Sequence, residues 1–147
     1  MKIFKFKIIN KRDKRNWKVL EVPENMSLYT FAEKIIKSFG FDFDHSFCFT
    51  SKLDNPSGPA EKLFELFVDL DDVENTEGAK GVRKYFISDA FEKKGDKMLY
   101  LFDYGDGWEF LLECLDNTED VIRTSRNYFK LVESHGEDPE QYPNWDE

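Results

Sequence analysis

The sequence predicts a single α+β domain in which an antiparallel or mixed sheet is packed by one amphipathic helix. Three observations predict it: apolar and polar residues alternate over residues 2–8, apolar residues recur at helical spacing over 27–39, and alternation returns at 97–115. A chain of 147 residues of which 40% are hydrophobic can build one core, so residues 1–147 are expected to form one domain.

The first strand is expected at residues 2–8, where the apolar side chains Phe4, Phe6 and Ile8 share one parity and therefore one face of a sheet. The polar run 10–16 then predicts a hairpin connection into a second strand that Pro23 ends.

The helix is expected at residues 27–39, because Ser27 is a good N-cap and Gly40 supplies a stop. A turn and a third strand are expected within residues 41–50. Strand, strand, helix and strand in this order predict a ubiquitin-like ββαβ N-terminal half.

The clearest hairpin is expected at residues 97–115, with Gly105-Asp106-Gly107 at its tip. In such a turn the Asp106 carboxylate would accept hydrogen bonds from nearby backbone N–H groups while the glycines take positive φ.

The remaining segments give weaker patterns. Residues 63–70 fit a short strand or a helical turn, residues 88–95 fit a short helix capped by Ser88, and residues 128–132 fit a last strand. An irregular acidic tail is expected from about residue 134.

Charge argues against a protein that coats nucleic acid or an anionic membrane, because the formal net charge is −9. Residues 1–52 carry eleven basic and six acidic side chains, whereas residues 53–147 carry ten and twenty-four. This asymmetry allows the basic half to bind an acidic partner, but we expect instead that the two halves neutralise each other across a shared interface.

Cysteine and histidine are scarce. Cys48 and Cys114 lie far apart in apolar runs, which predicts buried free thiols in a reducing cytoplasm rather than a metal or redox pair. No secretion signal or membrane-spanning run is predicted. His45 and His135 are the only imidazoles, which weakens hydrolase and zinc-enzyme hypotheses, and the sequence identifies no catalytic residue, metal ligand or cofactor.

A candidate ligand-binding site is expected around the tip of the 97–115 hairpin. Three carboxylates gather there beside two amphipathic rings, which suits recognition of a cationic or hydrogen-bond-donating group, and His45 follows two further aspartates. The candidate residues are Asp103, Tyr104, Asp106, Trp108, Glu109 and His45. The structural alternative is that the acids only stabilise the turn and that His45 is a hydrogen-bonding residue at the start of a strand.

Two functional classes remain open. The preferred one is a non-enzymatic module that binds a protein or small ligand through the aromatic and acidic hairpin. The alternative is a hydrolase or nuclease in which Asp103, Asp106 and Glu109 hold a divalent metal. Nucleic-acid contact through the basic run 11–15 is subordinate, since basic hairpin tips are usually solvated, and the acidic stretch 69–77 predicts a solvated loop rather than a calcium loop.

The run YLFDYGDGWEF at residues 100–110 closely resembles the hallmark of the plasmid pRiA4b ORF-3-like family. The segments 15–23, 27–31 and 40–45 are similar to that family in the same order, so the resemblance covers most of the chain. It implies a compact α+β domain without an established activity, sometimes found near mobile elements. Many relatives carry a histidine where this chain has Phe110, so any site built on that histidine would be incomplete here. The paired-glycine pattern common near the C-termini of relatives is reduced here to residues 136–143.

Overall fold

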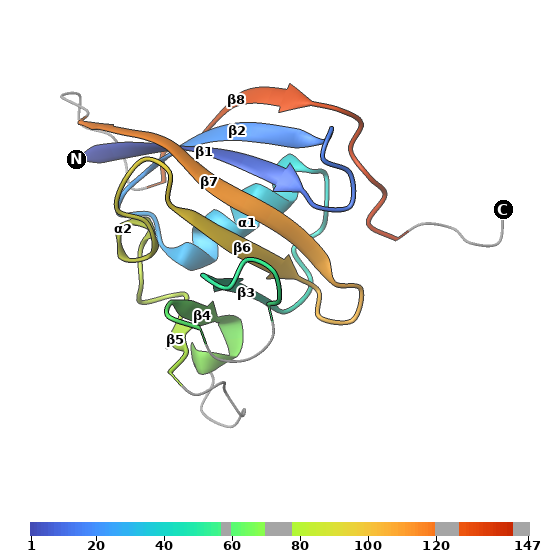
Figure 1. Cartoon of the computed structure of the whole chain (residues 1–147), viewed down its shortest axis with the longest axis horizontal. Helices are drawn as coiled ribbons and strands as arrows, with labels where there is room; N and C mark the ends of the chain where they lie inside the picture. Colours follow the sequence, from blue (N-terminus) through green and yellow to red (C-terminus); the bar gives the residue numbers. More distant parts are fainter. Residues whose placement is uncertain (57–59, 70–77, 120–126, 143–147) are drawn as a thin grey trace, which may run out of the picture.

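The computed structural model describes residues 1–56, 60–69, 78–119 and 127–142. Within these residues one sheet has the strand order β5-β4-β3-β6-β7-β1-β2-β8, and α1 packs across one of its faces (Figure 1). The strands are β1 (Lys2–Asn10), β2 (Trp17–Pro23), β3 (Phe47–Thr50), β4 (Leu63–Glu65), β5 (Lys80–Gly81), β6 (Lys97–Phe102), β7 (Trp108–Glu119) and β8 (Lys130–His135). The helices are α1 (Leu28–Ser38), the 3-10 turn η1 (Leu66–Asp69) and α2 (Ile87–Ala90). The pairing is antiparallel except between β4 and β5, so the sheet is mixed.

The N-terminal elements form as their local sequence predicts. β1 and β2 pair as a hairpin, and the even-numbered apolar residues of β1 are buried. The Ser27 hydroxyl accepts a hydrogen bond from the Thr30 N–H at 3.1 Å, which caps α1, and Gly40 ends the helix with a φ of +80°.

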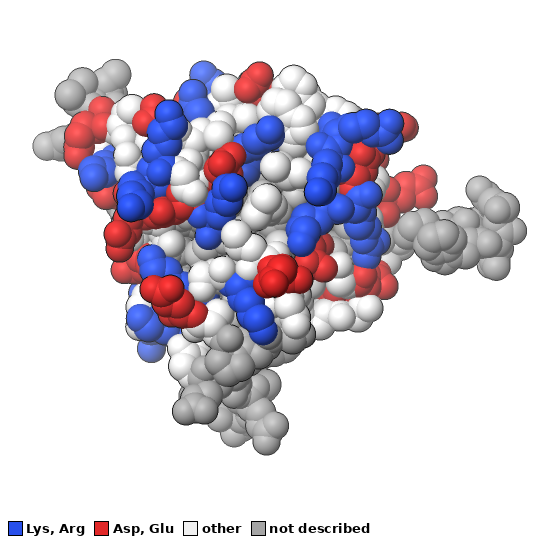
Figure 2. All heavy atoms as spheres, in the orientation of Figure 1, with Lys and Arg blue, Asp and Glu red and all other residues white. Residues whose placement is uncertain are grey.

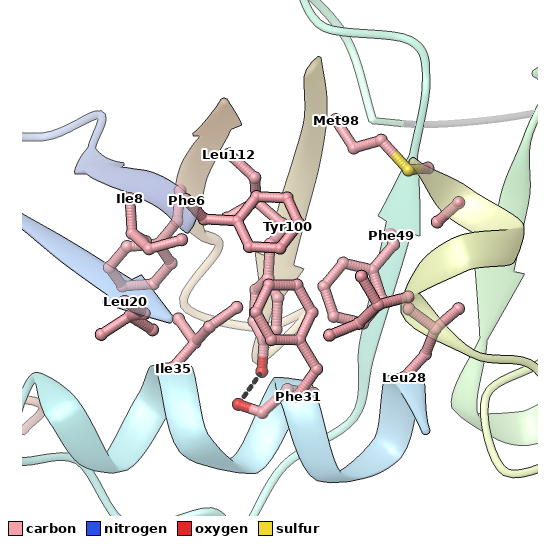
Figure 3. Packing of buried hydrophobic residues seen from close by; sticks show 14 of the residues in the cluster. Phe6, Ile8, Leu20, Leu28, Phe31, Ile35, Phe49, Met98, Tyr100 and Leu112 are labelled. Atoms are coloured by element: carbon pink, nitrogen blue, oxygen red, sulfur yellow. Dashed lines mark hydrogen bonds between the residues drawn. The ribbon is translucent and has the colours of Figure 1, made fainter. Parts of the chain in front are cut away.

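The core lies between the sheet and α1. Phe6, Ile8 and Leu20 from β1 and β2 face Phe31 and Ile35 of the helix, as Figure 3 shows. Tyr100 of β6 is fully buried, and its hydroxyl donates to the Ala32 carbonyl of α1 at 3.1 Å (Figure 3). A polar tip with a partner lets this large ring fill the centre of the core without an unsatisfied group.

The opposite face of the sheet carries basic and acidic side chains in alternation, and Figure 2 shows them interspersed over the surface. On this face Lys5 lies 3.9 Å from Glu21 and Lys97 lies 3.8 Å from Glu113. Lys11 lies 3.6 Å from Glu109, which joins the basic N-terminal part of the chain to the acidic remainder. Such exposed pairs contribute little stability each.

Three local elements differ from those that the sequence predicts. Residues 63–70 form both a short strand and a 3-10 turn, in β4 and η1. The short helix begins at Ile87 with Phe86 at the N-cap, not at Ser88, because the Asp89 side chain accepts from the Phe86 N–H at 2.7 Å. The last strand is longer and later than expected, at Lys130–His135.

The ubiquitin-like arrangement of the N-terminal half stays a prediction. The order β1, β2, α1, β3 is present along the chain, and β7 and β6 lie between β1 and β3 in the sheet. Residues 70–77 of the predicted acidic loop lie outside the described residues. Among the described helices, none has the length and apolar character needed to cross a membrane.

Candidate functional site

The turn between β6 and β7 is organised by Asp103, not by Asp106 as expected. Asp103 has a φ of +63°, and its Oδ1 accepts from the backbone N–H groups of Gly105 and Asp106, each at 3.2 Å. The Gly107 N–H donates to the Asp103 carbonyl at 2.6 Å, and Gly107 rather than Gly105 takes a positive φ. Aspartate tolerates this backbone region because its short side chain bonds locally. Asp103 is 6% exposed, so most of its bonding capacity belongs to the turn.

Trp108 is buried, and the expectation of an exposed recognition ring there is wrong. It shares its parity on β7 with Phe110 and Leu112, so it points toward the helix side of the sheet and is 3% exposed. Its ring centroid lies 4.9 Å from that of Phe41, and the Arg12 guanidinium lies 3.7 Å above the indole. Arg12 also donates to the Asp106 carbonyl, which closes this end of the core.

The other hairpin residues point to separate surfaces. Tyr104 is 42% exposed, and its hydroxyl donates to the Phe47 carbonyl at 3.1 Å, while partial burial raises the pKa of the phenol. Glu109 lies on the open face of the sheet, the face that α1 does not cover, and pairs with Lys11. Asp106 is exposed. Asp103 and Glu109 are therefore directed apart, and the three carboxylates do not converge on one metal. The described residues contain no group of three or more His, Cys, Asp or Glu arranged to hold a metal ion.

His45 does meet Asp103, as part of a surface group that we call the His45 cluster: Asp44, His45, Asp103 and Tyr142. His45 Nε2 lies 3.3 Å from Asp103 Oδ2 and 3.6 Å from Asp44 Oδ1. The same nitrogen lies 2.5 Å from the Tyr142 hydroxyl, which donates to Asp44 Oδ2 at 2.8 Å. The His45 and Asp44 side chains are 37% and 45% exposed, whereas that of Asp103 is only 8% exposed.

Desolvation and neighbouring carboxylates act together on the Tyr142 phenol. Desolvation, the hydrogen bond donated to Asp44 and the nearby negative charges raise the pKa of Tyr142 to about 12. The charges that act on this hydroxyl include Asp103 and Asp106. A phenol at this position therefore stays protonated and serves as a donor.

Tyr142 belongs to the C-terminal segment, which we define as residues 136–142. Asp138 Oδ1 lies 2.9 Å from Lys18 Nζ and accepts from Asn16 Nδ2 at 3.0 Å. Gln141 then bonds to Asp42, so the segment reaches from the β8 edge to the start of β3. In Figure 1 this segment descends from β8 at the same end of the sheet as the β6–β7 turn. The expectation of an irregular tail from about residue 134 misses these contacts.

One signal for this segment was present in the sequence. Lys18 shares its parity on β2 with the core residues Leu20 and Val22, and a lysine directed inward requires an anionic partner. The sequence does not show which of its many acids that partner is. Gln141, Tyr142 and Asp44 carry no comparable signal, because exposed polar residues in irregular segments are common.

The fold and the cluster together define an α+β domain with one mixed sheet and a surface group of acidic, imidazole and phenol side chains. The chain belongs to the plasmid pRiA4b ORF-3-like family, which it matches over residues 2–141 and whose function is unknown. A crystal structure of a protein of unknown function from Methanosarcina mazei Go1 is similar in fold, with a TM-score of 0.68 at 18% identity. The similarity covers 90% of this chain and 69% of that one. No curated protein gives a significant match.

Proposed function

We propose that this protein is a non-enzymatic binding module whose ligand site is the His45 cluster. The observation that carries the proposal is the convergence of His45 Nε2 with carboxylates from two separate segments, Asp44 and Asp103. Asp103 Oδ1 holds the turn while its Oδ2 lies beside His45, and the Asp44 side chain is 45% exposed and so open to a ligand. The side chain that now satisfies Asp44, Tyr142, is a hydrogen-bond donor.

The ligand class follows from this chemistry. Carboxylate oxygens accept hydrogen bonds and attract cations, so the site suits an amine, guanidinium or hydroxyl group. The exposed Asp106 adds negative charge nearby, as its effect on Tyr142 indicates. The charge of −9 favours approach of a cationic ligand over an anionic one.

Cys48 and Cys114 are buried free thiols, which supports a reducing compartment such as the cytoplasm.

Calorimetric titration with small probes tests the site. We expect acetyl-arginine amide or acetyl-lysine amide to bind the wild-type protein and acetyl-leucine amide to show no heat. Asp44→Asn should weaken the cationic probes by about tenfold, since a charged hydrogen bond is worth roughly 1.5–3 kcal/mol before solvent screening. The matched control is Asp54→Asn, because Asp54 is an exposed aspartate of the 51–56 loop that is not a member of the His45 cluster. Equal binding by wild type and Asp44→Asn contradicts the proposal.

The enzymatic alternative is favoured by one observation, the His45–Asp103 contact, because a carboxylate beside an imidazole is the arrangement of a general base. Its metal-dependent form is weakened by the separation of Asp103 from Glu109. Thermal unfolding with magnesium, manganese or calcium distinguishes the two, since a metal bound only by the folded state raises the melting temperature. We expect no shift with any of the three ions, and a rise of several degrees would support the metal enzyme.

A nucleic-acid partner is not favoured by the basic hairpin tip. Arg15 Nε lies 3.0 Å from Asp13, Lys11 pairs with Glu109 and Arg12 stacks on Trp108. A gel-shift titration should show no binding at physiological salt, and binding that falls steeply with added salt would restore this alternative.

A further inference from the structure

The side-chain amide of Gln141 occupies the position of a peptide group. Its Oε1 accepts from the Asp42 N–H at 2.7 Å, and its Nε2 donates to the Asp42 carbonyl at 3.0 Å. One residue of a β-strand exchanges the same pair of hydrogen bonds with a neighbouring strand. A primary amide presents C=O and N–H side by side, so Gln141 imitates the backbone of an extended peptide.

Tyr142 completes the occupation of the site. Its hydroxyl donates to Asp44 and lies against His45 Nε2, while Gln141 Nε2 adds a contact to Asp44 Oδ1 at 3.2 Å. Gln141 and Tyr142 thus already donate to the Asp44 oxygens that we propose as acceptors for a ligand. Gln141 therefore presents an amide that imitates a peptide group, and Tyr142 next to it presents a hydroxyl that donates a hydrogen bond.

The two ends of the C-terminal segment are held very differently. At residues 136–138, the buried Lys18 ammonium pairs with Asp138 and donates to the Ser134 hydroxyl at 2.6 Å. Gly136 lies so close to the β1–β2 connection that an added Cβ would clash with the Arg15 carbonyl oxygen. At residues 141–142, by contrast, every hydrogen bond is solvent-exposed.

We propose that Gln141 and Tyr142 form a latch that closes the His45 cluster by standing in for an extended peptide ligand. The ligand would be a peptide segment that bonds the Asp42 backbone and places a hydroxyl or cationic side chain against Asp44. This inference rests on the proposed function, because it names the ligand class of the same site.

The latch can open without loss of the fold. Exposed hydrogen bonds contribute little net free energy, so the few that hold residues 141–142 give a closed-to-open ratio on the order of ten to one. The anchor at Asp138 stays in place and keeps the released residues close to the site. A peptide in trans must compete with the latch, which lowers its apparent affinity by about that same factor.

The test is an NMR titration of the full chain with the uncharged, acetylated and amidated peptide Gln-Tyr, copied from residues 141–142. Three proteins are compared: wild type, the latch variant Gln141→Glu with Tyr142→Phe, and the control Glu140→Gln. The glutamate keeps the size of Gln141 but places a carboxylate against the Asp42 carbonyl and Asp44, and the phenylalanine removes the donor. Glu140 is exposed and next to the latch, so its variant matches the position without touching the contacts.

We expect the latch variant to bind the peptide at least about tenfold more tightly than wild type or Glu140→Gln, with amide shifts concentrated at residues 42–45. Equal affinity in all three proteins, or absence of shifts at Asp42 and Asp44 in the latch variant, overturns the latch. The cationic probes keep the two proposals separable. If acetyl-arginine amide binds while the peptide does not, the latch is wrong and the proposed function stands. If the peptide binds the latch variant while the cationic probe does not, the latch stands and the cationic ligand class is wrong.

Discussion

Two segments meet at the His45 cluster and are held in opposite ways. The turn at residues 103–107 is fixed by its own backbone, by the nearly buried Asp103 carboxylate and by the buried Trp108 that follows it. The C-terminal segment is fixed at Asp138 by two buried partners, Lys18 and Asn16, whereas residues 141–142 are held by exposed hydrogen bonds.

This difference means that the turn is part of the rigid scaffold, whereas residues 141–142 form a surface that can rearrange. The backbone N–H groups of the turn and Asp103 Oδ1 are hydrogen-bonded within the hairpin, so a ligand cannot engage them without opening it, and only Asp103 Oδ2, beside His45, is not used by the turn. The groups at residues 141–142 exchange readily with solvent and therefore with a ligand. A conspicuous aromatic and acidic turn can thus be mainly structural, while an unremarkable segment supplies the contacts that a binding partner would replace.

The largest effect is expected for Trp108→Ala, which tests the scaffold side of the comparison. The change removes a buried ring packed against Phe41 and Arg12, and the expected loss is about 3–5 kcal/mol in the free energy of unfolding. Urea unfolding followed by far-UV circular dichroism measures it. Trp17→Ala is the matched control, because Trp17 is only partly buried on the open face, where it stacks on His135, and should cost less. A loss below about 1 kcal/mol for Trp108→Ala would show that this end of the core is not the rigid region described above.

Asp138→Ala is expected to cost about 2–3 kcal/mol, because it leaves the buried Lys18 ammonium without its carboxylate, while the partial exposure of Asp138 moderates the loss. Glu137→Ala, at an exposed neighbouring position, should stay within about 0.5 kcal/mol. Chemical denaturation of both variants provides the comparison. Similar stabilities for the two would mean that Asp138 does not anchor the segment.

Asp103→Ala should destabilise the protein by about 1–3 kcal/mol, since two turn N–H groups lose their acceptor and alanine is disfavoured at a φ of +63°. Asp103→Asn keeps an acceptor and tolerates this backbone region, so its cost should be less than about 1 kcal/mol. Differential scanning calorimetry of the two variants distinguishes the contribution of the turn hydrogen bonds from that of the Asp103 negative charge. If asparagine costs as much as alanine, the His45 contact and not the turn fixes Asp103.

The smallest effect on stability is expected for Gln141→Ala, within about 0.5 kcal/mol, because its hydrogen bonds are solvent-exposed. The same denaturant titrations measure it. A loss above about 1.5 kcal/mol would place residues 141–142 with the scaffold and remove the contrast between the two segments.

Local sequence patterns were sufficient for the elements that depend on neighbouring residues. The alternation in β1, β2, β6 and β7, the Ser27 cap and the Gly40 stop each follow from a few adjacent positions, and all are present. The insertion of β6 and β7 between β1 and β3 could not be predicted, because pairing of distant strands leaves no signal within either strand alone.

The site was predicted less completely than the fold. His45 and Asp103 were both candidates and do meet, but they come from separate segments and nothing in either segment indicates the other. Trp108 was assigned to a surface although its parity with Phe110 and Leu112 pointed inward, so the strand period was the better guide. The inward Lys18 predicted an acidic partner without identifying it, since any of the thirty acidic residues could serve.

Amide hydrogen exchange at Asp42 tests the closed latch most directly. Within the described part of the chain, its N–H donates to the Gln141 side chain alone, whereas the amides of β3 are bonded within the sheet. We predict that Asp42 is protected in the wild-type protein and that Gln141→Ala speeds its exchange about tenfold while the rates at residues 47–50 do not change. An Asp42 amide that exchanges equally fast in both proteins would contradict the account.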